Sequence, residues 1–194
     1  DYITLYRNLY IDNSTRNNKV KGINQYANDV VYNWSNGAYI MGGDSEGSSY
    51  SIAEGNLFIN GPAKGGNAFT GGNARVHMYA NDNWQDRDMD GVFDPYEIPQ
   101  SEYSGGPTFQ STRFDYPVVP LWSAKELLTN SLPTVGASLP YRDHADWYVI
   151  NEVLSLGKKG ALISTEETLP IGIPTSWGLW AGNKKTDTDG DGIP

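Results

Sequence analysis

The feature that most constrains the fold of this chain is a repeat of short apolar runs, each flanked on both sides by Asn or Asp. Its copies begin at positions 8, 29, 56 and 83, so they are spaced by 21, 27 and 27 residues. They are Asn8–Asp12, Asp29–Asn33, Asn56–Asn60 and a weaker copy that starts at Asn83-Trp84. Periods of roughly 20 to 30 residues with one or two short strands are typical of a parallel β-solenoid, whose coils stack on one another.

Asn at equivalent turn positions has a physical role in such a stack. Asn tolerates the left-handed backbone region, and its amide can hydrogen-bond to the coils above and below. Short β-like runs bounded by Gly, Asn, Asp or Pro fit the same picture, namely Ile3–Ile11, Asp29–Tyr32, Tyr50–Ile59 and Ala74–Ala80. The sequence therefore predicts an all-β parallel solenoid, with a β-sandwich that has Asn-rich turns as the alternative.

Two stretches have a helical pattern, Trp122–Leu128 and Tyr141–Leu156. In the second, Asp143 is a candidate N-cap, and the apolar residues fall largely on one side. These residues are Ala145, Tyr148, Val149, Ile150, Val153 and Leu154. We expect this helix to pack against the flank of the β-coils.

The composition narrows the classes of function. A length of 194 residues suggests one domain, or one domain with an appendage, and 38% hydrophobic residues suffice for a core. The absence of Cys excludes disulfides and thiolate metal sites. There is no run of about 18 apolar residues, so no membrane span is predicted. A net charge of −9 without a basic cluster argues against nucleic-acid binding.

The segment Asp86–Glu97 has the residue pattern of a calcium-binding loop. Counted from the first residue, acidic side chains stand at positions 1, 3, 5, 9 and 12, with Gly91 at position 6 for the sharp turn. The predicted ligands are Asp86, Asp88, Asp90, the Val92 carbonyl, Asp94 and Glu97. The number of oxygen ligands favours Ca²⁺ over Mg²⁺. Because Pro95 and Pro99 disfavour flanking helices, we expect a calcium loop that clips a long connection in place.

A second, partial copy of this pattern lies at the end of the chain. Asp187, Asp189 and Asp191 fill positions 1, 3 and 5, and Gly192 fills position 6. The chain ends at Pro194, before positions 9 and 12. We expect this partial loop to bind Ca²⁺ weakly.

Four segments together resemble the pectate lyases of the first polysaccharide lyase family. Leu5–Lys21 is similar to the family's H-H-N-L-F strand, turn and R-N-P-R-V-R motif, and Asn28–Trp34 is similar to the coil N-N-V-I-Y-N-W that follows. Val135–Asp146 resembles the V-G-A-x-x-P-x-R-D-x-x-D segment of bacterial members, and the tail Thr186–Pro194 is also like theirs. The four segments occur in the same order as in the family and span most of the chain. No single segment is specific for the family, but the four together are.

The resemblance implies a right-handed parallel β-helix that cleaves polygalacturonate by β-elimination with the help of Ca²⁺. By position it implies that Arg16 is the base and that Lys21 and Lys19 bind substrate carboxylates. The chain departs from the family pattern in that Asn18 replaces its Pro and two of its arginines are lysines. A lysine binds a carboxylate as a point charge, so affinity or substrate choice can differ.

The residues themselves are compatible with this chemistry under one condition. An arginine, which stays protonated at neutral pH, is a base only in an alkaline medium and with a cation that stabilises the developing charge. Lys19 and Lys21 alternate along an extended segment, so their side chains share one face and both can meet an anionic polymer.

The resemblance also implies a missing part. The family's calcium-binding carboxylates lie on coils before the arginine turn, and this chain begins at Asp1. We therefore expect the C-terminal portion of a secreted, periplasmic or cell-surface enzyme, which acts with its N-terminal half. We expect β-coils at 1–85, the calcium loop and lateral loops at 86–134, and a flanking helix and tail at 135–194.

Two other functions remain open. A non-catalytic carbohydrate-binding β-helix could have kept the scaffold and lost the site, and the replacements at Asn18, Lys19 and Lys21 fit that reading. A calcium-stabilised adhesion or structural module would also contain Asp-rich loops.

Overall fold

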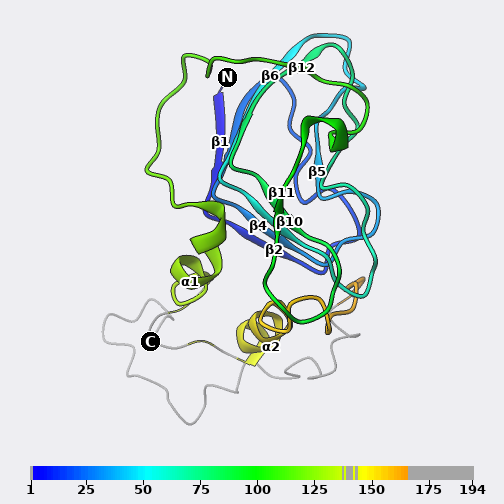
Figure 1. Ribbon diagram of the computed structural model, residues 1–194, viewed down its shortest axis with the longest axis vertical. Coiled ribbons are helices and arrows are strands. Elements are labelled where there is room, and N and C mark those ends of the chain that lie inside the picture. Colours follow the sequence, from blue (N-terminus) through cyan, green and yellow to red (C-terminus); the bar gives the residue numbers. More distant parts are fainter. Residues whose placement is uncertain (1, 137, 139–141, 143, 166–194) are drawn as a thin grey trace, which may run out of the picture. The chain divides into compact units, whose positions relative to one another are not determined.

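A computed structural model describes residues 2–136, 138, 142 and 144–165 (Figure 1). The chain divides into two compact units, Asp1–Leu162 and Ile163–Pro194, and the account below concerns the first. Its elements in chain order are β1 (Tyr2–Tyr6), β2 (Leu9–Ile11), β3 (Ile23–Ala27), β4 (Val30–Tyr32), β5 (Tyr39–Ile40), β6 (Ser49–Glu54), β7 (Leu57–Ile59), β8 (Phe69–Thr70), β9 (Val76–Asn81), β10 (Trp84–Asp86), β11 (Tyr96–Glu97), the 3-10 helix η1 (Gln100–Glu102), β12 (Thr108–Phe109), the 3-10 helix η2 (Ala124–Glu126), α1 (Leu127–Ser131) and α2 (His144–Val153).

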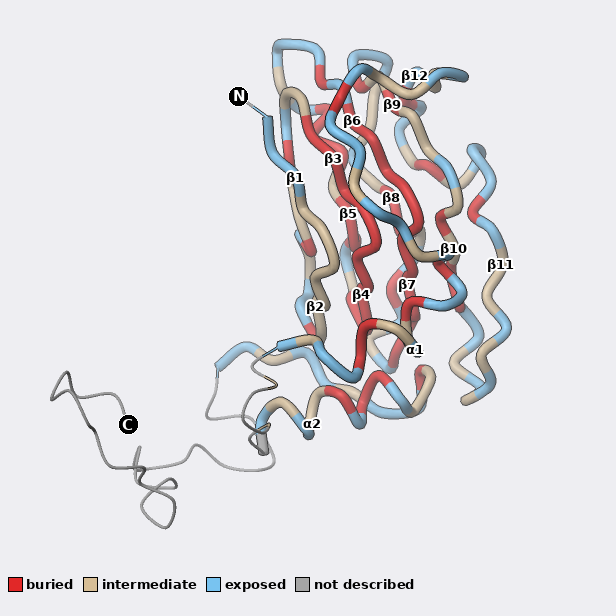
Figure 2. The backbone as a smooth tube through the Cα atoms, turned by 90° about the vertical axis from the view of Figure 1, so that its left-hand side faces the viewer, coloured by how far each residue is buried: buried red, intermediate tan, exposed pale blue. Residues whose placement is uncertain are grey.

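The four repeat copies lie one above another as the strands β2, β4, β7 and β10. These strands pair in parallel, with Leu9 beside Val30, Val30 beside Leu57 and Leu57 beside Trp84. A second parallel sheet has the order β1-β3-β6-β9-β12, and β5 pairs with β8 in a third. The chain is thus a parallel β-helix, as predicted, and the β-sandwich alternative is wrong (Figure 2).

Asn and Asp side chains form the ladder that the repeat predicted. The Asn8 side-chain amide donates to Asp29 Oδ1 at 2.8 Å, and the Asp29 backbone N–H donates to Asn56 Oδ1 at 2.9 Å. The Asn56 amide then donates to Asn83 Oδ1 at 2.8 Å. Each rung satisfies a buried polar group of the next coil, which fixes the register of the stack.

Two of the expected β-runs are each divided into two strands. Ile3–Ile11 is interrupted at Arg7, which has a φ of 59°, and Tyr50–Ile59 is interrupted at Gly55, with a φ of 64°. A positive φ turns the chain out of the extended direction, so one coil contributes strands to two sheets. Strand β3 was not anticipated, because Asn24 and Gln25 make it look polar although both are buried.

The interior of the coils is rich in aromatic rings. Tyr26, Phe58 and Phe69 are fully buried there, with ring centroids 6.5 Å apart for Tyr26–Phe58 and 5.0 Å apart for Phe58–Phe69. A second apolar cluster lies on the outer face of the β2-β4-β7-β10 sheet, where Leu127 of α1 and Val153 of α2 are buried against it. The prediction that the second helix packs against the coils is confirmed (Figure 1).

Both expected helical stretches contain helix, but their details differ. The first becomes η2 followed by α1, which extends beyond Leu128 to Ser131. Ala145 on α2 and Leu154 directly after it are exposed while Glu152 is buried, so the expected apolar side was partly wrong. Asp143, the expected cap, lies outside the described residues. No helix in the described ranges is long and apolar enough to cross a membrane.

Candidate functional site

Arg16 lies on the exposed turn between β2 and β3. Its backbone has a φ of 58°, in the left-handed region, and its side chain points into solvent. Among the described residues, none makes a hydrogen bond or an ion pair with its guanidinium. The turn therefore presents a cation that no described residue engages.

Lys19 and Lys21 follow on the same coil, and they share a counter-ion. Lys19 Nζ lies 2.7 Å from Asp44 Oδ2, and Lys21 Nζ lies 3.2 Å from Asp44 Oδ1. The two lysines thus reach the same carboxylate from one face, in agreement with their alternation along the chain. Hydrogen bonds from Lys19 and then from Lys21 lower the pKa of Asp44 to about 2.

The backbone around the two lysines is fixed by the next coil. Lys19 forms an isolated parallel bridge with Ile40. Gly42, with a φ of 70°, lies so close to the Lys21 stem that a Cβ there would be 2.8 Å from Lys21 Cγ. A glycine at this turn therefore makes room for the lysine side chain.

A surface depression of about 480 Å³ borders this ion-paired group. Glu46 and Arg75 line it together with Asp44, and the Arg75 guanidinium donates to the Glu46 carbonyl at 2.8 Å. The full lining is Gly43, Asp44, Ser45, Glu46, Asn73, Ala74 and Arg75.

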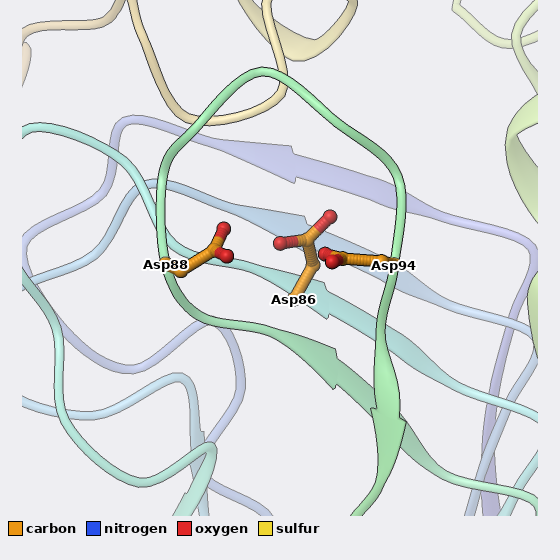
Figure 3. A group of neighbouring side chains, drawn as sticks. All are labelled: Asp86, Asp88 and Asp94. Atoms are coloured by element: carbon orange, nitrogen blue, oxygen red, sulfur yellow. The ribbon is translucent and has the colours of Figure 1, made fainter.

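Three of the predicted calcium ligands come together in the loop after β10. Asp86, Asp88 and Asp94 each offer a carboxylate oxygen, and these oxygens lie within 4.8 Å of one another. Figure 3 shows the three carboxylates turned toward one another across the loop. Asp86 is 2% exposed at the end of β10, whereas the other two are exposed.

The electrostatics of this group fit a bound cation. Asp86 Oδ2 is buried and has no hydrogen-bond partner in the described structure. Burial, and then the charges of Asp88, Asp94 and Asp90, raise the pKa of Asp86 to about 6. Converging carboxylate oxygens with an unsatisfied buried acceptor are the hard ligands that Ca²⁺ and Mg²⁺ prefer.

The remaining predicted ligands have other positions. Asp90 Oδ1 accepts a hydrogen bond from the Val92 backbone N–H at 2.7 Å, so it shapes the loop. Glu97 stands opposite Trp84 in the antiparallel pair of β10 and β11, and Asp86 is two residues further along, roughly 7 Å away along the strand. The described loop therefore gathers positions 1, 3 and 9, while positions 5 and 12 lie outside that group. Val92 is exposed in the same loop, and Asp187, Asp189 and Asp191 lie outside the described residues.

A pair of buried carboxylates, Asp12 and Glu152, was not anticipated. Asp12 is fully buried and Glu152 is 5% exposed, and each has one oxygen without a hydrogen-bond partner in the described part of the chain. Burial and then the contact with Glu152 raise the pKa of Asp12 to about 8. The available signal was an acidic residue between Ile150 and Val153 on the apolar side of a helix. Asp44 was also missed, although it follows a Gly-Gly turn one coil after the lysines.

The chain is similar along nearly its whole length to fungal proteins named "Probable pectate lyase C". The identity is 46% over 99% of this chain for the protein of Neosartorya fischeri and 44% over 99% for that of Emericella nidulans. For two Aspergillus fumigatus strains it is 45% over the same share. The chain spans only 44–45% of the length of these relatives.

No family model matches the chain, and no solved structure matches it. The resemblance to pectate lyases that the four sequence segments indicated is nevertheless confirmed by relatives that match 99% of the chain.

Proposed function

We propose that this chain is part of a pectate lyase, which cleaves polygalacturonate by β-elimination. The observation that carries the proposal is the similarity of 99% of the chain to proteins named pectate lyase C. The parallel β-helix and the cations of the coil at 16–21, of which Arg16 and Lys21 are exposed and Lys19 is half-buried, are in keeping with it. The proposal includes action outside the cytoplasm, together with the remaining sequence of a longer protein.

Arg16 is the general base in this proposal. Elimination requires a group that takes the C5 proton of a uronate, and the guanidinium of Arg16 is exposed without a described partner. Because an arginine is protonated at neutral pH, we expect cleavage to require alkaline conditions.

Lys19 and Lys21 hold the polymer by its carboxylates. Their ammonium groups already form salt bridges with one carboxylate, that of Asp44, at 2.7 and 3.2 Å. A uronate bound in this way would orient the sugar through two point charges, without the bidentate fork of an arginine.

Calcium has two roles in the proposal. Ca²⁺ shared between a substrate carboxylate and protein carboxylates supplies the charge that makes the neighbouring C–H bond acidic. We assign the carboxylates for that role to the remaining sequence of the protein. Asp86, Asp88 and Asp94 instead hold a structural cation that closes the connection between β10 and β11.

The experiment is the release of 4,5-unsaturated product from polygalacturonate at alkaline pH with Ca²⁺. It compares this chain, the chain joined to the remaining sequence, and Arg16→Ala and Lys64→Ala in the joined protein. Lys64 is a matched control, because both residues are exposed, have a φ near 57° and stand five residues after a strand of the same sheet.

We expect activity in the joined protein, a loss of about 100-fold or more in Arg16→Ala, and little change in Lys64→Ala. Absence of product from the joined protein would contradict the lyase. Binding of polygalacturonate without product would then favour the carbohydrate-binding β-helix, and absence of both would favour the calcium-stabilised module.

A further inference from the structure

The carboxylate of Asp44 bridges the ammonium groups of Lys19 and Lys21 with one oxygen on each, at 2.7 and 3.2 Å. A uronate carboxylate has the same two oxygens with the same charge. It can take this place between the two lysines only if Asp44 leaves it. We propose that Asp44 is a built-in competitor of the substrate carboxylate and so sets the affinity for acidic saccharides. This inference rests on the proposed role of the two lysines.

The ion pairs of Asp44 with Lys19 and Lys21 are weak enough for a ligand to replace them. The side chain of Asp44 is 61% exposed, against 26% for Lys19 and 43% for Lys21. Ion pairs this exposed are weak because water and salt screen them. An incoming uronate therefore exchanges one weak pair of contacts for another of the same chemistry.

The backbone of Lys19 and the stem of Lys21 have contacts that do not involve Asp44. Lys19 is bridged to Ile40 through the backbone, and the stem of Lys21 packs against Gly42. Asp44 instead stands on the turn that follows Gly42, where its exposed side chain helps to line the depression of about 480 Å³. Displacement thus requires a change of the Asp44 side chain and leaves the Lys19 backbone and the Lys21 stem in position.

The turn that carries Asp44 does not depend on its charge. The Asn73 side-chain amide donates to the Gly43 carbonyl, and the Gly43 backbone N–H donates to the Gly71 carbonyl at 2.8 Å. The isosteric substitution Asp44→Asn therefore removes the competitor while the turn keeps its backbone contacts. In the wild type, the low pKa of the Asp44 carboxyl, about 2, keeps this group ionised from mildly acidic to alkaline pH, so the competition persists over that range.

The test measures binding of de-esterified oligogalacturonate to the full chain by isothermal titration calorimetry. Asp44→Asn is compared with Glu46→Gln, a matched control that removes an exposed carboxylate from the same depression without touching a described salt bridge. We expect Asp44→Asn to tighten binding by about three- to tenfold, and Glu46→Gln to change it by less than about twofold. Asp44→Glu, which restores the charge, should return the affinity toward that of the wild type.

The outcomes separate the inference from the function on which it rests. Binding that is lost in Lys19→Ala but unchanged or weakened in Asp44→Asn would overturn the competitor and leave the lysines as substrate ligands. Failure of the wild-type chain and of Asp44→Asn to bind would overturn both. A fully methyl-esterified oligosaccharide has no carboxylate to compete, so an equal gain with that probe would also contradict the inference.

Discussion

The lysine pair and the acidic loop of this chain differ in whether the chain itself supplies a counter-ion. Lys19 and Lys21 share a counter-ion that the chain itself provides, Asp44. Asp86, Asp88 and Asp94 gather within 4.8 Å, yet none of the described salt bridges reaches them. A ligand of the lysines must therefore displace a partner, whereas a cation in the acidic loop relieves repulsion. We expect the first to bind weakly and reversibly and the second to stabilise the fold.

The largest effect should come from the cation of the acidic loop. At a Ca²⁺ concentration 100 times its dissociation constant, the free energy of unfolding should rise by about 3 kcal/mol, and a chelator should reverse this. Thermal unfolding with Ca²⁺ or with chelator measures the shift. Asp86→Asn should abolish it, while Asp44→Asn, in the other charged region, should leave it intact. A shift that survives Asp86→Asn would refute the contrast between the two regions.

The buried pair of Asp12 and Glu152 extends the comparison to carboxylates neutralised by a proton. Because the pKa of Asp12 is raised from 3.8 to about 8, the folded protein retains a proton that the unfolded chain releases. The free energy of unfolding should therefore fall as the pH rises from about 4 to about 8. Tyr32 and Tyr148 also face this pair, and their pKa values are raised as well, so they stay neutral over this range.

Asp12→Asn should flatten this pH dependence. It should be more stable than the wild type at pH 9 by about 1–3 kcal/mol and close to it at pH 5, because an amide can donate to Glu152. Urea unfolding at both pH values makes the comparison, with Glu152→Gln as the reciprocal variant. Parallel pH curves for wild type and variant would argue against a shared proton.

Smaller effects are expected for single substitutions in the acidic loop, and their sizes should differ between residues. Asp88→Asn should weaken Ca²⁺ binding by about tenfold, which is about 1.4 kcal/mol. Asp90→Asn and Glu97→Gln should weaken it by less than about threefold, since their carboxylates lie outside the group of three. Calorimetric titration with Ca²⁺ gives the affinities. Equal losses in all three variants would instead support the full twelve-residue ligand set.

The smallest effect should follow from Arg16→Ala. An exposed side chain without described partners contributes little, so the free energy of unfolding should change by less than about 0.5 kcal/mol. Arg16→Gly should raise it slightly, because the φ of 58° suits glycine. Urea unfolding checks both variants. A loss above about 1 kcal/mol in Arg16→Ala would mean that the turn needs this side chain for its structure.

The stacking of the coils was predictable because the signal repeats along the chain. Asn8, Asp29, Asn56 and Asn83 mark equivalent positions, so their spacing alone places four strands in register. Asp44 and Glu152 were not predictable in the same way. Each meets its partner on another coil or element, and nothing local in the sequence encodes that approach. Asp12 illustrates both cases, since its place in the repeat was visible and its contact with Glu152 was not.

The acidic loop at 86–97 shows a third kind of limit. Its pattern predicted six calcium ligands, and three of its acidic residues converge. The pattern assumes a loop that wraps around the ion through position 12. Here Glu97 instead belongs to β11, whose antiparallel pairing with β10 sets it beside Trp84. Secondary structure at the end of the loop thus decides which carboxylates meet.

The Asn ladder gives the stack a direction. The backbone N–H groups of Asn8, Asp29 and Asn56 each donate to the side-chain oxygen of the next ladder residue, so these rungs run from the earlier coil to the later one. At the other end of the strands, Asn33 instead donates back to Asp12. Successive coils that present the same donor and the same acceptor are interchangeable units. A gene that lost or duplicated one whole unit of 27 residues would still join a donor to an acceptor at the new seam. The ladder thereby lets such a protein change its length in evolution by whole coils.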